Sequence, residues 1–145
     1  MAERVSPALK RLIRERRIVR SRISRDMVLK ELKGAESDRN DAIESFEASK
    51  FKWATVQGYY SIFHSARALL YSKGFREKSH RALLQALREL FDRELPRSML
   101  GDFEDAMSMR EAADYGLIFS EEAAHDVLKT AEAFLDKAKL ILRTK

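Results

Sequence analysis

Two arginines interrupt stretches that otherwise have the pattern of apolar helix faces. Arg67 falls between Phe63 and Leu70, and Arg110 continues a line that includes Phe103 at helical spacing. Burying a guanidinium without a partner is costly, so each arginine must reach water along its stem, pair with a carboxylate or face a polar cleft. We therefore expect either arginine to bind an anion or, in the simpler alternative, only to reach solvent.

Arg110 is the stronger candidate for anion binding because acidic and aromatic residues follow it closely. Asp114 lies four residues later, where it could pair with Arg110 along a helix, and Tyr115 comes next. A planar guanidinium suits phosphate. A groove lined by Arg110 and Asp114 could therefore hold a phosphate group.

The histidines offer little catalytic spacing. His64, His80 and His125 are scattered, and the chain has no cysteine, so we expect no metal site and no cofactor. His80 follows Lys78 and Ser79 at a predicted helix start, where free amides and Lys78 could hold a phosphate. A simple helix cap is the alternative there, and His64 is expected to be a hydrogen-bonded, half-buried side chain.

Positive charge is concentrated at the N-terminus. Residues 1–25 carry nine basic residues against two acidic ones, a net +7, so the chain total of +5 leaves −2 for the remainder. Clustered cations bind polyanions with release of counterions. The segment is either a nucleic-acid-binding surface or a solvated basic helix face, and the binding candidates are Arg11, Arg14, Arg16, Arg17 and Arg20.

A long helix over 52–74 must position these groups. Its large apolar residues cover more than half the circumference, an arc that runs from Trp53 to Leu70. The other side is a stripe of small residues from Ala54 to Ser72, which would allow a second helix to approach closely. The spacing does not say whether that second helix belongs to the same chain or to a partner copy.

The remaining elements are also helical. Serines able to cap helices, and a proline suited to a first turn, predict helices over about 7–20, 24–49, 79–93, 96–115 and 120–145, with a kink or break possible at Gly34. The expected fold is all-α. It is an up-and-down four-helix bundle with an additional short helix, in which residues 1–23 form a basic helical extension and residues 24–145 the bundle. No stretch predicts a membrane span or a secretion signal, so a cytoplasmic location is expected.

Two stretches together resemble the HEPN domain, in particular the small prokaryotic HEPN proteins associated with minimal nucleotidyltransferases. They are GYYSIFHSARALLYSKGFREKSH and, some thirty residues later, MREAADYG. The resemblance covers about residues 27–142. It implies a helical bundle, a homodimer and a place in a prokaryotic toxin–antitoxin-like system, with a minimal nucleotidyltransferase, a nucleotide or RNA as partner.

The resemblance leaves the activity open. Ribonucleases of this family use an arginine followed after four to six residues by a histidine, whereas Arg110 is followed by EAADYGLIF. Without that imidazole no group titrates near neutrality to activate a ribose hydroxyl. The leading interpretation is a binding protein; the alternatives are a ribonuclease toxin that combines Arg110 with His64 or His80, and a structural adaptor without ligand. Related systems adenylylate a tyrosine near the motif, which would be Tyr115. The ligand-binding candidates are Arg110, Asp114, Tyr115, Lys78, His80, His64 and Arg67.

Overall fold

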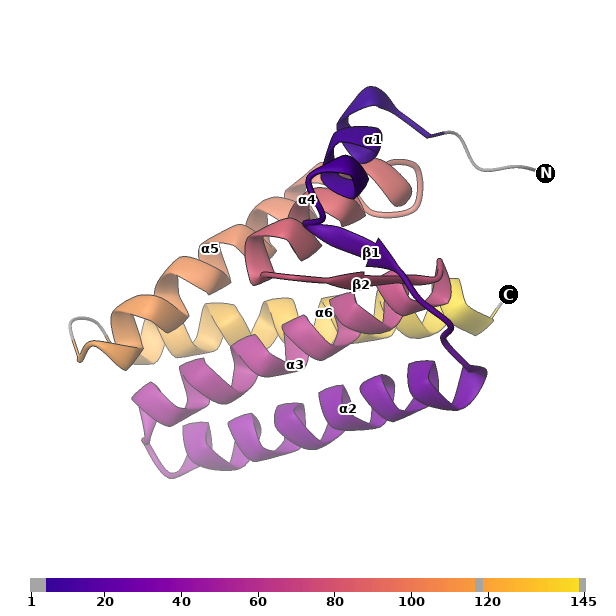
Figure 1. The fold of residues 1–145 in the computed structure, drawn as a ribbon. Helices are drawn as coiled ribbons and strands as arrows, with labels where there is room; N and C mark the ends of the chain where they lie inside the picture. Colours follow the sequence, from indigo (N-terminus) through magenta and orange to yellow (C-terminus); the bar gives the residue numbers. More distant parts are fainter. Residues whose placement is uncertain (1–4, 117–118, 144–145) are drawn as a thin grey trace.

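The computed structural model describes residues 5–116 and 119–143, and it confirms the predicted all-α class (Figure 1). Six helices and one small two-stranded sheet make up this part of the chain. In order they are α1 (Pro7–Arg14), β1 (Ile18–Arg20), α2 (Arg25–Glu47), α3 (Phe51–Ser72), β2 (Phe75–Glu77), α4 (His80–Leu90), α5 (Arg97–Asp114) and α6 (Glu121–Arg143). None of the described helices has the length and apolar character that crossing a membrane requires.

Helix α3 is the centre of the bundle. It contacts α2, α4, α5, α6 and β2, and Figure 1 shows it running alongside α2 with α6 behind. The small-residue stripe is an internal contact. The Ser61 hydroxyl donates to the Ala35 carbonyl of α2 at 2.7 Å, and a Cβ built on Gly58 would lie 3.0 Å from Val127 of α6. Close approach of these backbones therefore depends on side chains that are small or absent.

The predicted helix starts are confirmed at four serines. The hydroxyls of Ser6, Ser24, Ser79 and Ser120 each accept from a backbone amide three residues later. Each bond satisfies one of the amides that a first turn leaves unpaired. The segments that carry the candidate residues therefore begin where the sequence indicates.

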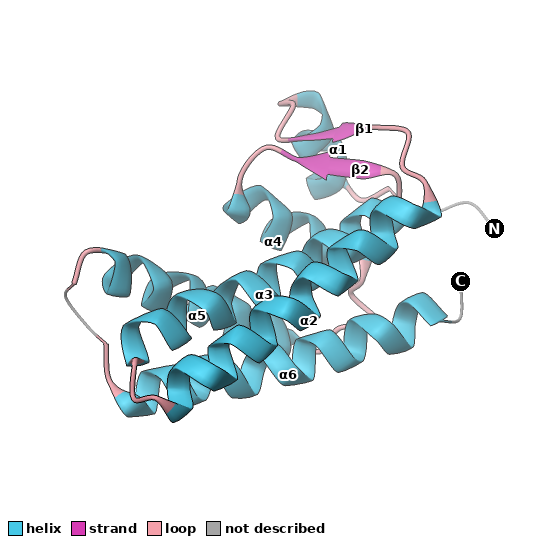
Figure 2. Ribbon diagram, turned by 90° about the horizontal axis from the view of Figure 1, so that it is seen from below, coloured by secondary structure: helices cyan, strands magenta, loops and turns pink. Residues whose placement is uncertain are grey.

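The expectation of a helix to about Arg20 is wrong. Helix α1 ends at Arg14, and Arg16 adopts a positive φ of 57° that turns the chain. Residues 18–20 then form β1, which pairs antiparallel with β2 in a segment expected to be a loop (Figure 2). Ile18 is fully buried. A β-branched pair, Ile18 and Val19, favours the extended backbone, and burial of Ile18 holds it there.

Two further expectations about helices fail. Helix α2 continues through Gly34 without a break, and the ring of His64 on α3 lies 3.6 Å from where a Cβ at Gly34 would stand. This glycine admits a neighbouring side chain and does not end the helix. Trp53, assigned to the apolar arc, is 53% exposed because it lies in the first turn of α3, at the end of the bundle.

Candidate functional site

Arg110 projects from α5 onto two tyrosine rings of α3. Its guanidinium carbon lies 5.3 Å from the centroid of the Tyr59 ring and 5.9 Å from that of Tyr60, which is cation–π geometry. One amino group donates to the Asp114 carboxylate at 2.8 Å, and the Arg110 side chain is 21% exposed. The predicted pairing of Arg110 with Asp114 is therefore present, at a partly open position.

His80 reaches the same tyrosines from the first turn of α4. Its ring stacks on Phe63 at 4.1 Å between centroids, and its Nδ1 lies 2.5 Å from the Tyr59 hydroxyl. Burial, reinforced by the charge of Arg110, lowers the pKa of His80, while burial raises the pKa of Tyr59. The Tyr59 phenol therefore keeps its proton and donates to Nδ1 of a neutral His80, so the imidazole proton is placed on Nε2.

We call Tyr59, Tyr60, Phe63, His80 and Arg110 the tyrosine cluster. It joins α3, α4 and α5 at one point, although its members come from three separate stretches of sequence. Arg110 and His80 flank one ring, since the His80 ring stacks on Tyr59 with 5.6 Å between centroids. A positive hydrogen-bond donor, a neutral imidazole and aromatic surface are thus brought together, a combination suited to a phosphate with an attached base.

Three other candidates lie around this cluster and are exposed. Asp114 ends α5, and Tyr115 caps that helix with 79% of its surface exposed. Lys78 lies between β2 and α4, where its backbone amide donates to the Arg17 carbonyl at 2.9 Å. The Lys78 side chain is exposed, and Lys78 lies two residues before His80 in the sequence.

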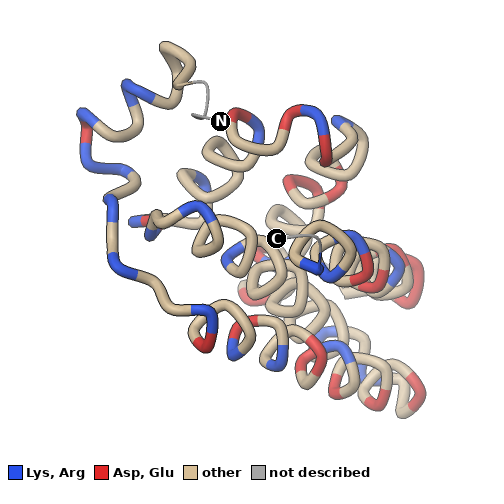
Figure 3. Tube along the Cα trace, turned by 90° about the vertical axis from the view of Figure 1, so that its right-hand side faces the viewer, with Lys and Arg blue, Asp and Glu red and all other residues tan. Residues whose placement is uncertain are grey.

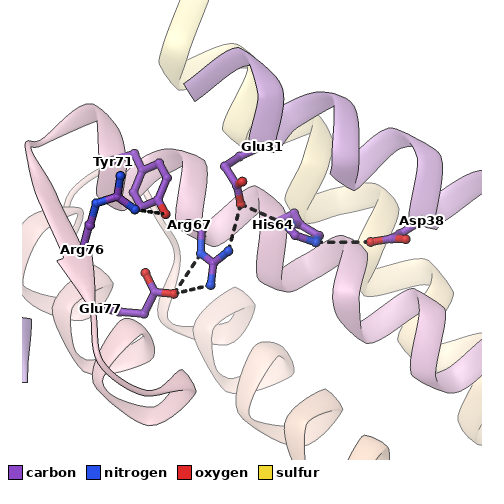
Figure 4. Close-up of polar contacts among 7 residues, drawn as sticks. All are labelled: Glu31, Asp38, His64, Arg67, Tyr71, Arg76 and Glu77. Carbon is purple, nitrogen blue, oxygen red and sulfur yellow. Dashed lines mark hydrogen bonds and ion pairs between the residues drawn. The ribbon is translucent and has the colours of Figure 1, made fainter. Parts of the chain in front are cut away.

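Arg67 and His64 belong to a different group on the α2 side of α3 (Figure 4). Arg67 contacts the Glu77 carboxylate at 2.7 and 2.9 Å and lies 3.5 Å from Glu31. His64 bridges Glu31 at 2.9 Å and Asp38 at 3.5 Å. We call these five residues the ion-pair network, and they share no member with the tyrosine cluster.

Within the ion-pair network, the shifts in pKa favour the charged forms of Glu31 and Arg67. Burial raises the pKa of Glu31, but the hydrogen bond from His64 and the charges of His64 and Arg67 outweigh it, so the pKa is lowered overall. Burial alone would lower the pKa of Arg67, yet the bond to Glu77 raises it. Burial raises the pKa of Asp38. Arg67 therefore has carboxylate partners within the fold, and we interpret its role as structural.

The N-terminal candidates lie on α1, β1 and the turn between them. Arg11 pairs with Glu15 at 2.9 Å, Arg20 lies over the Phe75 ring at 4.9 Å, and Arg14 and Arg16 are exposed. Arg17 is half-buried. None of these elements contributes to the tyrosine cluster, so the structure separates the basic segment from Arg110.

Sequence reasoning assigns no functional role to the residues that surround the two arginines. Sequence reasoning places Tyr59 and Tyr60 only in the packed face of the helix. Because successive residues of a helix point in different directions, their adjacency is the signal that aromatic surface extends to two sides. Glu31 and Glu77 were missed as partners of Arg67 because they come from α2 and β2. Helical spacing reports neighbours within one helix and cannot supply such contacts.

Comparison with known proteins places this geometry in a family. The HEPN domain matches residues 29–141. A UPF0332 protein of Archaeoglobus fulgidus is 32% identical over 117 residues, which cover 74% of this chain and 89% of that protein. Two proteins of Methanocaldococcus jannaschii are similar as well. "Putative toxin MJ0605" is 29% identical over 75% of this chain and 84% of its own length, and "Putative toxin MJ0142" is 30% identical over 72% and 75%.

The matched region contains all of the tyrosine cluster and all of the ion-pair network, together with α3, α4 and α5 in full. The predicted resemblance is thereby confirmed over the part of the fold that carries the ligand-binding candidates, while the N-terminal arginines lie outside it. The chain belongs to the HEPN domain family.

Proposed function

We propose that this protein is the nucleotide- or RNA-binding component of a prokaryotic toxin–antitoxin-like system, and that it works with a minimal nucleotidyltransferase in the cytoplasm. The observation that carries the proposal is Arg110, a partly exposed cation held over the rings of Tyr59 and Tyr60. Two relatives whose names contain the word toxin support the kind of system.

The chemistry of binding follows from the tyrosine cluster. Arg110 would donate to a phosphate oxygen, and the partly exposed Tyr60 ring offers a face for a base. Asp114 already occupies one amino group of Arg110, so a phosphate must displace that carboxylate or share the guanidinium with it. The exposure of Asp114 makes such a displacement inexpensive, because exposed ion pairs contribute little.

The proposal gives Tyr115 a role at the partner contact. Its side chain is 79% exposed at the end of α5, one turn beyond Arg110. A nucleotidyltransferase could transfer the adenylyl group of ATP to the Tyr115 hydroxyl with release of pyrophosphate.

Size-exclusion chromatography with light scattering would test the homodimer that the family resemblance implies.

The binding experiment compares Arg110→Ala with Arg97→Ala by calorimetric titration of ATP and of a short RNA. Arg97 is an exposed arginine on the same helix, which makes it a matched control. We expect Arg110→Ala to weaken binding by about 10-fold to 100-fold, the usual effect of losing a charge-assisted hydrogen bond to phosphate. Equal affinity of the two variants for both ligands would contradict the proposal.

One observation favours a second function, a ribonuclease toxin that uses Arg110 with His80. Both side chains lie against the ring of Tyr59, so folding supplies an imidazole that the sequence after Arg110 lacks. With its proton on Nε2, neutral His80 can donate a hydrogen bond to a leaving oxygen, whereas transfer of a proton to that oxygen requires the imidazolium form. Acting as the base instead would require the other tautomer, with Nε2 free.

Expression in a bacterial host, followed by sequencing of RNA ends, tests the second function. Arg110→Ala and His80→Ala should each abolish growth arrest and cleavage. His64→Ala should retain both, because His64 lies in the ion-pair network. Intact RNA in cells that express the wild-type protein would exclude this function.

A further inference from the structure

A row of arginines follows the outer edge formed by α1, the turn after it, β1 and the link to α2. In Figure 3 it is the run of blue along the side of the tube that leads down to α2. We call Arg11, Arg14, Arg16, Arg17, Arg20 and Arg22 the basic edge. Beneath it Leu9, Leu12 and Ile18 are buried, and β1 is paired with β2. The basic edge is therefore displayed on a fixed scaffold.

Most of this charge is not neutralised within the described residues. Arg11 pairs with Glu15, whereas in the described parts of the chain no ion pair joins Arg14, Arg17 or Arg22 to an acid. Like charges so close together repel one another. A row of cations of this kind is favourable only when counterions or an anionic partner cover it.

A cleft opens beside the basic edge, between α1 and α4. Its volume is about 600 Å³, and Pro7, Ala8 and Leu12 form the apolar part of its lining. Arg11, Arg17 and Arg88 also line the cleft, and the Arg88 guanidinium donates to the Glu104 carboxylate at 3.1 Å. Both lining acids have partners, since Glu15 binds Arg11 and Glu89 accepts from the Ser6 hydroxyl at 2.6 Å. The cleft thus combines apolar surface with three arginines against two acids, a small excess of positive charge.

We infer that the basic edge and this cleft bind single-stranded RNA, at a site separate from the tyrosine cluster. The phosphates lie along the basic edge, and one unpaired base with its sugar enters the cleft against Ala8 and Leu12. Eight of the nine basic residues in the first 25 are arginine. Guanidinium groups bind phosphate in bidentate fashion and stack on bases, which lysine does not do. An unpaired base is required because a duplex keeps its bases stacked inside.

The experiment measures fluorescence anisotropy of a labelled oligouridine of about 12 nucleotides, a length in the range that single-strand sites cover. Arg14→Gln/Arg17→Gln/Arg22→Gln removes three charges of the basic edge. Lys33→Gln/Lys50→Gln/Lys129→Gln removes three exposed charges elsewhere and is the matched control. The slope of log K against log salt should fall by about 2 in the first variant, from about 0.7 per lost phosphate contact. Affinity should fall at least about 10-fold, with little change in the control.

A second variant tests the cleft without removing charge. Ala8→Leu fills part of the lining at an exposed position with an aliphatic side chain, on which bases do not stack, and should weaken oligouridine binding about 5-fold, the loss of one base contact. The triple variant of the basic edge should keep the wild-type affinity for ATP, which the tyrosine cluster is proposed to bind, so failure of this site is distinguishable from failure of the function proposed above. Equal loss in the two triple variants, unchanged binding in Ala8→Leu, or preference for anionic lipid vesicles over RNA would overturn the inference.

Discussion

Two groups of polar residues lie against helix α3, and the arginine in each has different partners. On the α2 side, Arg67 meets the carboxylates of Glu77 and Glu31. On the α4 and α5 side, Arg110 meets tyrosine rings and the single exposed carboxylate of Asp114. Both arginines interrupt an apolar stripe, and the sequence distinguishes them only by the Asp114 and Tyr115 that follow Arg110.

The difference lies in what remains for a ligand to do. Glu77 is only 6% exposed, and Arg67 binds its Oε2 inside the fold, while its buried Oε1 has no hydrogen-bond partner among the described residues. The tyrosine cluster leaves Arg110 partly open beside aromatic surface and a neutral imidazole. Both guanidiniums lie over aromatic rings, since Arg67 is 4.4 Å from the Phe63 centroid, so the difference is that Arg67 binds the buried Glu77 whereas Arg110 binds only the exposed Asp114.

The largest expected effect is on the ion-pair network. Arg67→Met should lower the free energy of unfolding by about 3 kcal/mol, because it leaves the Glu77 carboxylate buried without its cation. Urea denaturation followed by circular dichroism measures the change. Arg110→Met should cost less than about 1 kcal/mol, since its partner Asp114 is exposed.

The control is the double variant Arg67→Met/Glu77→Met, which removes both charges. It should recover most of the lost stability, because no charge is left buried without a partner. If Arg67→Met and Arg110→Met had equal effects on stability, the distinction between the two arginines would fail.

A pH titration of stability examines the tyrosine cluster. The pKa of His80 lies below its ordinary 6.5 in the folded protein, so below that value the unfolded chain binds more protons than the native state. The stability contributed by neutral His80 is therefore fully present above about pH 6.5 and is lost as the pH falls through the lowered pKa. Denaturation midpoints of the wild type should fall more steeply from pH 8 to about pH 5.5 than those of His80→Phe.

A stabilising change is expected at the edge of the ion-pair network. Gly34→Ala should raise the free energy of unfolding by about 0.5–1 kcal/mol, because alanine is the better helix former and its Cβ would meet His64 at 3.6 Å, an ordinary contact. Gly101→Ala in α5 is the control, since a Cβ there meets nothing within 4 Å. A loss of stability in Gly34→Ala alone would show that the His64 ring cannot tolerate the methyl group.

The smallest effect on stability is expected at Asp114. Asp114→Asn removes one exposed ion pair between residues four apart and should cost about 0.3 kcal/mol. Affinity for ATP should rise, because the carboxylate that competes for Arg110 is gone. Calorimetry of Asp114→Asn beside wild type would detect the gain in ATP affinity that accompanies the small loss of stability. Weaker ATP binding would mean that the Asp114 carboxylate contributes to binding the ligand.

Sequence reasoning was accurate for most patterns that lie within one helix. The serine caps, the buried face of α3 and the pairing of Arg110 with Asp114 all depend on neighbours within four residues. It failed where a partner comes from another element. The contact of His80 with Tyr59, the pairing of Glu77 with Arg67 and the strand at Ile18 require the tertiary fold, which local spacing does not encode.

The pairing of β1 with β2 has a consequence for the order in which the chain is made. Ile18 pairs with Glu77, so its partner is synthesised only after α2 and α3 have been translated. Until then the arginine-rich start of the nascent polypeptide has no strand to dock on, although it has already left the ribosome. Closing this ribbon joins distant parts of the chain and is therefore a late step of folding, after the local helices have formed.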